Sequence, residues 1–177
     1  RSAEVAVVTA RVKELEARGW SFEAADASFE LLVRHEVDEV PPAPPCELES
    51  YRVVVDHTTS GEVVAQATVK VHVAGERVIA TAEGNGPINA LDGALRQVLT
   101  AHVPWLATVE LSDYKVRILP GTYGTDAVTR VLVDTSDGTG TWTTVGVHGN
   151  IVEASWLALL DAMTYAALRH PGVASTL

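Results

Sequence analysis

The chain has 177 residues, of which 47% are hydrophobic, so it is long and apolar enough to bury a core of ordinary domain size. Its formal net charge of -10 disfavours nucleic acid as a partner, because a phosphate backbone is bound by clustered Lys and Arg side chains. No apolar run is long enough to span a bilayer, no signal peptide is visible, and the single Cys46 fits a reducing compartment. We therefore expect a cytoplasmic protein that contacts neither nucleic acid nor membrane.

The first part of the chain is expected to form two short helices. Between Glu4 and Arg18 apolar residues recur on one side of a helix, and Gly19 is well placed to end it. A second helix is expected to run from Ser21, whose side chain could cap it, to about Glu36. Two such short helices bury little surface by themselves, so their apolar faces need a neighbour.

A proline-rich segment follows these helices. Four of the five residues from 41 to 45 are proline, which fixes φ and lacks an N–H donor, so we expect an extended linker over residues 41–46. This linker separates a helical linker subdomain, residues 1–40, from a second region, residues 47–177. In the second region the apolar spacing changes from helical to alternating, which indicates strands.

The second region begins with three predicted strands and a helix. Alternating apolar residues indicate strands near residues 51–56, 62–73 and 77–83, separated by short turns that contain glycine. A helix is then expected from Pro87 to about Ala101, because proline is favoured in the first helical turn. The order of elements is βββα.

The same order recurs further along the chain. Ser50-Tyr51-Arg52-Val53 reappears as Asp113-Tyr114-Lys115-Val116, 63 positions later. A hairpin turn is expected at Asp137-Gly138, and a final helix that Asn150 could cap follows. The two remaining strands are expected at residues 128–134 and 141–147.

This recurrence predicts an α+β fold of tandem βββα units, residues 47–107 and 108–177. Each unit is expected to form an antiparallel three-stranded sheet covered by a helix. The final helix carries two apolar stripes, one containing Ala158 and the other Leu160. One stripe can cover its own sheet, and the other needs the sister helix or a second subunit, so we expect a dimer.

The sequence shows no recognisable catalytic or metal-binding pattern. Its six histidines lack the spacing of metal ligands and no nucleophile motif is present, so we expect no metal, no cofactor and no catalytic residue. One segment, Glu83–Ala90, suggests a binding site because glycines flank Asn85 at the start of a predicted helix. Unpaired amides there could hold a carboxylate. The alternative is an ordinary strand-to-helix turn that needs glycine for a positive φ.

Six segments carry a combined likeness to a known family: Val12–Glu16, Gly19–Glu23, Ala25–Leu31, Gly84–Ala90, Asp113–Arg117 and Ile151–Trp156. Together they resemble the C-terminal part of the 2-isopropylmalate synthase family, and they are most similar to its citramalate synthase branch. The resemblance implies that a catalytic TIM barrel normally precedes this region and condenses acetyl-CoA with a 2-oxo acid, using a divalent metal. That barrel is missing from this sequence, so we do not expect the chain to be active alone.

The resemblance also implies a regulatory role. In the family the paired βββα units form a homodimeric allosteric domain that binds a branched-chain amino acid for feedback inhibition. Leucine is the usual effector of the isopropylmalate enzymes and isoleucine of the citramalate enzymes. Carried over onto this sequence, the effector pocket would include Gly84, Asn85, Gly86, Pro87, Ile88 and Asn89 from the first unit, and Leu111, Tyr114, Ile118, Thr125, Asp126 and Val128 from the second.

Within this pocket the residue types suggest separate roles. The amides at the helix start would receive the carboxylate of the amino acid, and apolar side chains such as Ile88, Leu111 and Tyr114 would surround its branched side chain. Asn89 or Asp126 would accept hydrogen bonds from the ammonium group.

Two other hypotheses stay open at this point. The region could be a purely structural dimerisation module whose effector site has decayed, in which case a bulky side chain or a closed turn should fill the space at Gly84–Asn89. It could also be an independent enzyme with a cryptic site, in which case the chain alone should turn over acetyl-CoA.

Overall fold

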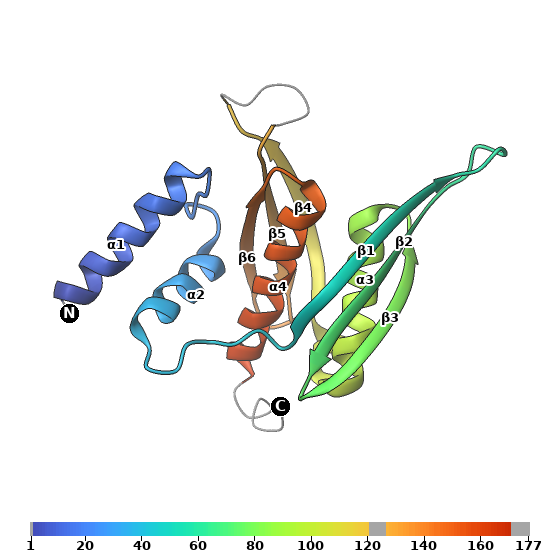
Figure 1. The fold of residues 1–177 in the computed structure, drawn as a ribbon. Helices are drawn as coiled ribbons and strands as arrows, with labels where there is room; N and C mark the ends of the chain where they lie inside the picture. Colours follow the sequence, from blue (N-terminus) through green and yellow to red (C-terminus); the bar gives the residue numbers. More distant parts are fainter. Residues whose placement is uncertain (1, 121–126, 171–177) are drawn as a thin grey trace. The chain divides into compact units, whose positions relative to one another are not determined.

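The computed structural model describes residues 2–120 and 127–170, which divide into two compact units (Figure 1). We call them the α3 unit, Pro45–Thr108 with His170, and the α4 unit, residues 2–44 with Val109–Arg169. The elements in chain order are α1 (Ser2–Ala17), α2 (Asp26–Val37), β1 (Glu47–His57), β2 (Val63–Val73), β3 (Glu76–Gly84), α3 (Pro87–His102), the 3-10 helix η1 (Pro104–Thr108), β4 (Glu110–Ile118), β5 (Thr129–Ser136), β6 (Thr141–His148) and α4 (Ile151–Arg169).

In the α3 unit, three antiparallel strands in the order β1-β2-β3 are covered by α3 on one face. Alternate residues of β2 from Ala65 to Val73 are buried, and the residues between them are more exposed, as expected for a strand with one covered face. Helix α3 begins at Pro87 and buries Leu91 and Leu95 at helical spacing. Each of these buried leucines contributes roughly 1.5–3 kcal/mol of hydrophobic stabilisation.

In the α4 unit, three antiparallel strands in the order β4-β5-β6 are covered by α4 on one face. Thr144 of β6 lies on this face, and its hydroxyl donates to the carbonyl of Ala158 in α4 at 2.7 Å. The opposite face of β6 carries Val145 and Val147, which form a core cluster with Ala25. The predicted α+β fold of two helix-covered, antiparallel three-stranded sheets is therefore confirmed.

The two sheets share an irregularity at the same point of the first strand. In β1 the register shifts between Leu48 and Ser50, and in β4 it shifts between Leu111 and Asp113. These two places are 63 positions apart, which is the offset at which the sequence recurs. A shared bulge is a specific feature of strand pairing, so it supports a tandem duplication more strongly than the order of elements does.

Small residues bring each helix close to its sheet. A Cβ atom added to Gly146 of β6 would collide with the carbonyl oxygen of Ala154 in α4, so only glycine fits there. In the α3 unit the position equivalent to Gly146 is Ala82 on β3, and the close approach is made possible by a glycine on the helix, Gly93. A Cβ atom added to Gly93 of α3 would lie 3.2 Å from the Cβ of Ala82.

The start of α2 differs from the sequence-based prediction. The predicted cap at Ser21 is wrong, because α2 begins at Asp26 and the preceding residues form a turn in which the Ala25 N–H donates to the Phe22 carbonyl at 3.2 Å. Phe22 stacks on Trp20 with ring centroids 6.2 Å apart, and both pack against the core cluster of β6. Burying two aromatic side chains stabilises the chain by more than a helix cap does, so the helix starts later.

Helix α2 closes the free edge of the second sheet. The carboxylate of Asp26 accepts the N–H of Thr143 at 3.0 Å, and the hydroxyl of Ser28 accepts the N–H of Val145 at 3.0 Å. The same hydroxyl donates to Oδ2 of Asp161 in α4 at 2.7 Å. Two side chains of α2 therefore satisfy edge amides that would otherwise be open to another strand.

Part of the second apolar stripe of α4 also faces α2. Tyr165 donates to Glu30 of α2 at 2.9 Å, and Leu160 lies opposite residues of that helix. Helix α2, which the prediction did not name, therefore contributes to the surroundings of Leu160, and the coverage of this stripe by a second subunit stays a prediction. By length and a mean hydropathy of 1.3, α4 could cross a membrane, but half of the relevant window is buried within the fold, as in a core helix.

The hairpin between β5 and β6 is fixed to the end of α4. The predicted turn at Asp137-Gly138 is confirmed, with Gly138 at a φ of 81°. Oδ1 of Asp137 accepts the N–H groups of Thr139 and Gly140 at 2.9 Å, and Oδ2 accepts from Arg169 at 2.9 Å. The guanidinium and these donors hold the pKa of the Asp137 carboxyl well below its ordinary value.

The close contact at Gly146 generates a stability prediction. The substitution Gly146→Ala forces α4 away from the sheet and should lower the free energy of unfolding by about 2 kcal/mol. Gly149→Ala is the matched control, because a Cβ there would meet no atom within 4 Å. Urea unfolding followed by circular dichroism measures both, and equal stabilities for the two variants would contradict the packing argument.

The hydrogen bond between Ser28 and Asp161 generates a prediction about pH. Burial raises the pKa of Asp161 from 3.8 to about 6, partly opposed by the bond from Ser28. Between these values the folded state holds a proton that the unfolded state has lost, so this group's contribution to stability falls as pH rises through that window.

The substitution Asp161→Asn should abolish this fall. The free energy of unfolding of the variant, relative to the wild type, should rise by on the order of 2 kcal/mol between pH 4.5 and pH 7.5. Urea unfolding at several pH values tests this, and a difference that does not change with pH would refute it.

Candidate functional site

The start of α3 has open backbone donors. Gly86 occupies the N-cap position with φ −167° and ψ 168°, and no side chain within residues 2–120 and 127–170 caps the helix. Pro87 fills the first turn, as predicted, and the N–H groups of Ile88 and Asn89 have no hydrogen-bond partner among the described residues. Amides at a helix start lie at the positive end of the helix dipole, so this arrangement can receive an anion such as a carboxylate.

Glycine at position 84 serves close packing and not a special backbone angle. Gly84 and Gly86 are absent from the glycines with positive φ, so the expectation that this turn needs a positive φ is wrong. A Cβ added to Gly84 would lie 2.5 Å from Oδ1 of Asn89 and 2.6 Å from the nitrogen of Ala90, which means that strand β3 ends directly against the first turn of α3. A Cβ at Gly86 would meet nothing within 4 Å.

The duplicated unit provides an internal comparison for this helix start. Asn150 stands 64 positions after Gly86, and its Oδ1 accepts the N–H groups of Val152 and Glu153 at 2.8 and 3.3 Å. The prediction that Asn150 caps the final helix is therefore confirmed. The start of α4 is closed by its own side chain, whereas the equivalent start of α3 is open.

Three of the predicted effector residues lie on one face of β4. Leu111, Tyr114 and Ile118 share the face on which α4 packs, because Tyr114 contacts Ser155 of that helix with their hydroxyl oxygens 2.9 Å apart. Burial raises the pKa of the Tyr114 hydroxyl above its ordinary value, and the bond to Ser155 partly opposes this shift. Ile118 is 67% exposed, so the stripe ends in an open apolar surface.

Val128 faces the other way. Its side chain packs against the core cluster that includes Val145, on the sheet face opposite Tyr114, and its carbonyl accepts the N–H of Leu119 at 3.0 Å. The predicted residues Thr125 and Asp126 lie outside the described residues. The α3 start and the β4 stripe belong to different units, so their union in one effector pocket stays a prediction.

The first strands of both units carry the same exposed pattern. Leu48 and Val55 of β1 occupy the positions equivalent to Leu111 and Ile118 of β4, and they are 39% and 51% exposed. β1 and β4 are both edge strands of their sheets. Apolar side chains left exposed on an edge strand are typical of a surface that binds a ligand or another subunit.

A comparison with known proteins assigns the family. A model of the LeuA allosteric (dimerisation) domain matches residues 23–167. The chain belongs to this family. The match confirms the resemblance found in the sequence.

Curated relatives of this LeuA-type domain carry the names of two synthases. The chain is 55% identical to an (R)-citramalate synthase of Streptomyces coelicolor, over 92% of the chain and 30% of the relative. It is 48% identical to an (R)-citramalate synthase of Synechocystis, over 89% of the chain and 29% of the relative. It is 36% identical to a 2-isopropylmalate synthase of Acidimicrobium ferrooxidans, over 89% of the chain and 28% of the relative. The chain thus spans less than a third of these relatives.

The described part of this LeuA-type domain contains no group of three or more His, Cys, Asp or Glu side chains placed to hold a metal ion. Cys46 is buried, and burial raises the pKa of its thiol to about 11. A thiol with so high a pKa is neutral at physiological pH and is therefore a poor nucleophile.

Sequence reasoning missed one partly buried polar pair, Ser28 and Asp161. Asp161 is held by Ser28, which is 133 positions away, so no local pattern could pair them. A signal was nevertheless present, because Asp161 is an acidic residue within an otherwise apolar run of α4. An isolated carboxylate in an apolar helix indicates a specific partner or a function.

The contrast between the two helix starts generates a prediction about stability. The substitution Gly86→Asn places in α3 the cap that α4 already has, and Gly86→Ala adds a Cβ without a hydrogen-bond acceptor. The extended backbone at this position suits either residue. Thermal and urea unfolding should show Gly86→Asn to be more stable than Gly86→Ala by about 1 kcal/mol. Equal stabilities would mean that the α3 amides are not free.

Proposed function

We propose that this chain is the regulatory and dimerisation region of a citramalate or 2-isopropylmalate synthase, and that it binds isoleucine or leucine for allosteric feedback inhibition. The observation that carries the proposal is the match to the LeuA allosteric (dimerisation) domain over residues 23–167. The names of the relatives support the type of synthase.

The open start of α3 supports the place of the effector. The amides of Ile88 and Asn89, which bond to no residue that the structure describes, can each donate to one carboxylate oxygen of an amino acid. Charge-assisted hydrogen bonds of this kind are strong. The segment Gly84–Asn89 is partly exposed, so a ligand can reach these donors. The exposed side chains of the β4 stripe would provide the apolar surface that a branched side chain needs.

The rest of the enzyme belongs to the same proposal. A catalytic barrel outside this sequence would condense acetyl-CoA with a 2-oxo acid, and this chain would supply no catalytic residue, metal ligand or cofactor. The intact protein would be a cytoplasmic homodimer. Effector binding would then act by favouring one of two subunit arrangements, because a ligand shifts an equilibrium only by its differential affinity for the two states.

A second candidate function is a structural dimerisation module without an effector. The close packing around Gly84 favours the structural module, because Asn89 and Ala90 already occupy the space that a Cβ at this position would need. The open space at Gly86 and the missing cap of α3 count against it. The two functions differ in whether a branched-chain amino acid binds.

Isothermal titration calorimetry of the chain with isoleucine and with leucine tests the proposal. We expect one of the two amino acids to bind with a Kd below about 1 mM. Gly86→Asn should weaken this binding at least about tenfold, because the new side chain occupies the amides that receive the carboxylate. Gly86→Ala should keep the wild-type affinity.

The possible outcomes test separately whether the chain binds an effector and whether the α3 amides are the binding site. If neither amino acid gives heat or a thermal shift, effector binding by this chain alone is refuted and the structural module is favoured. If an amino acid binds but Gly86→Asn and Gly86→Ala weaken it equally, the effector role stands and the assignment to the α3 amides fails.

A further inference from the structure

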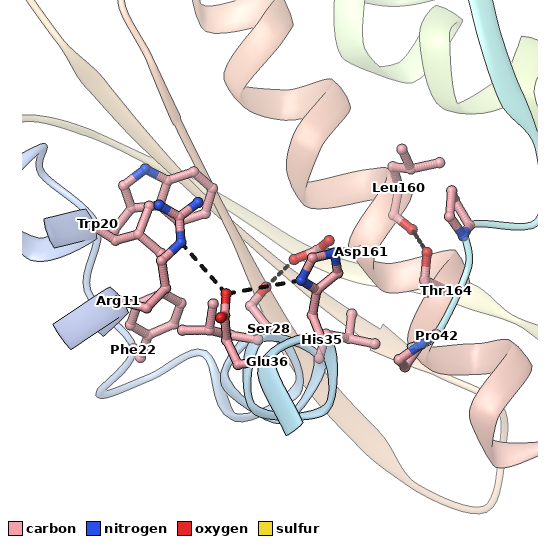
Figure 2. A pocket seen from close by; sticks show the side chains of 14 residues that line it. Arg11, Trp20, Phe22, Ser28, His35, Glu36, Pro42, Leu160, Asp161 and Thr164 are labelled. Atoms are coloured by element: carbon pink, nitrogen blue, oxygen red, sulfur yellow. Dashed lines mark hydrogen bonds and ion pairs between the residues drawn. The ribbon is translucent and has the colours of Figure 1, made fainter. Parts of the chain in front are cut away.

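The α4 unit contains a cavity that the proposed effector site does not use. It has a volume of about 430 Å³ and lies between α1, α2 and α4, with part of the proline-rich linker at its rim (Figure 2). Leu15 of α1, Leu31 of α2 and Leu160 of α4 contribute apolar surface, and Trp20 and Phe22 add aromatic surface. Cavities of this size and composition are typical of sites for small organic molecules.

One carboxylate is fixed in the wall of this cavity. Oδ2 of Asp161 accepts the hydroxyl of Ser28, and Ser28 is in turn held by the N–H of Val145. Oδ1 of Asp161 makes no hydrogen bond to any described residue. Figure 2 shows the carboxylate beside Ser28, which reaches it from α2. The group is therefore oriented through one oxygen while the other stays available.

The other charged groups of the cavity do not neutralise Asp161. Arg11 of α1 pairs with Glu14 at 2.7 Å and lies 3.8 Å from Glu36 of α2. His35 of α2 is also 3.9 Å from Glu36. No cation lies within ion-pair distance of Asp161 among the described residues, and burial raises the pKa of this carboxyl to about 6. A partly buried carboxylate without a counter-ion is costly, so binding a cation there is favourable.

We propose that this cavity binds a small organic ammonium ion with a branched or aromatic apolar body, and that the ammonium group is held by Asp161. The apolar walls bury the body of the ligand, and the free oxygen of the carboxylate accepts from its N–H groups. An organic anion of the same shape is excluded, because Asp161 and Glu36 would repel it.

This site is independent of the proposed effector site. The start of α3 offers donors for a carboxylate, whereas the cavity offers an acceptor for an ammonium ion. The cavity wall is built from the helices α1 and α2 together with α4, so a bound ligand would hold the N-terminal helices on this unit. Its chemistry can be tested with molecules that have no carboxylate at all.

The experiment uses 3-methylbutylamine as the probe. Isotope-labelled chain is titrated at pH 7.5 and followed by amide and indole NMR signals, in parallel with the neutral 3-methylbutanol and the anionic 3-methylbutanoate. We expect the amine to bind at least about tenfold more tightly than the alcohol, and the anion not to bind. The signals of Trp20 and Ser28 should shift most.

Two variants assign the ammonium contact. Asp161→Asn keeps the shape of the side chain and removes its charge, so the affinity for the amine should fall to that for the alcohol. Asp56→Asn removes the same charge from an exposed strand of the α3 unit and should leave the affinity unchanged. If Asp161→Asn does not fold, the comparison of amine with alcohol on the wild-type chain still decides the matter.

The pH dependence gives a further readout on the wild-type chain. Affinity for the amine should decrease as pH falls below about 6, since the protonated carboxyl no longer attracts an ammonium ion. Saturating isoleucine or leucine should not displace the amine. Equal affinities for amine and alcohol, shifts that avoid Trp20 and Ser28, or displacement by either amino acid would each overturn the proposal. The first two results leave open whether the amino acids bind, and displacement would show that an amino acid binds in this cavity instead.

Discussion

The structure depends on how closely one helix approaches each sheet. A helix packs against a sheet at the distance set by the side chains between them, and here that distance is set by Gly146 against Ala154 and by Gly93 against Ala82. With the backbones this close, Thr144 can bond to a carbonyl of α4 and Tyr114 can reach Ser155. The glycine that permits the close approach lies on a strand in the α4 unit and on the helix in the α3 unit.

One hydroxyl joins α2 to two elements of this framework at once. Ser28 bonds both to the edge of β6 and to Asp161 on α4, and Asp26 and Glu30 add further bonds from α2 to β6 and to α4. The turn that precedes α2 adds the aromatic contacts of Trp20 and Phe22. As a result, helices that look like a separate linker in the sequence belong to the same compact unit as the second βββα segment.

Periodicity along the chain was sufficient to predict the strands, the two covering helices and the duplication, because these features depend on residues close in sequence. Asn150 and Asp137-Gly138 were predicted for the same reason. The start of α2 was missed, since Ser21 has the local chemistry of a cap but its neighbours Trp20 and Phe22 are drawn into a distant core. Ser28 and Asp161 were missed because their contact joins positions 133 residues apart.

Within the candidate effector site, the sequence identified the α3 start and the β4 stripe by type of residue. It could not separate the roles of the glycines, because whether a glycine serves an angle or a close contact depends on what lies next to it. At Gly84 a Cβ would collide with the first turn of α3, whereas at Gly86 a Cβ would meet no atom within 4 Å. Nor could local pattern place Val128, whose side chain faces the core on the opposite side of the sheet from Tyr114.

The cap at Asn150 bears on how many ligands one chain can take. A domain that arose by duplication begins with two identical places for a ligand, and nothing in the sheets themselves distinguishes them. Asn150 caps one of the two helix starts with its own side chain, whereas Gly86 has no side chain with which to cap the other. Under the function proposed above, only the uncapped copy would take up an amino acid, which would give a stoichiometry of one amino acid per chain and a regulatory response without competition between the two halves of the same molecule.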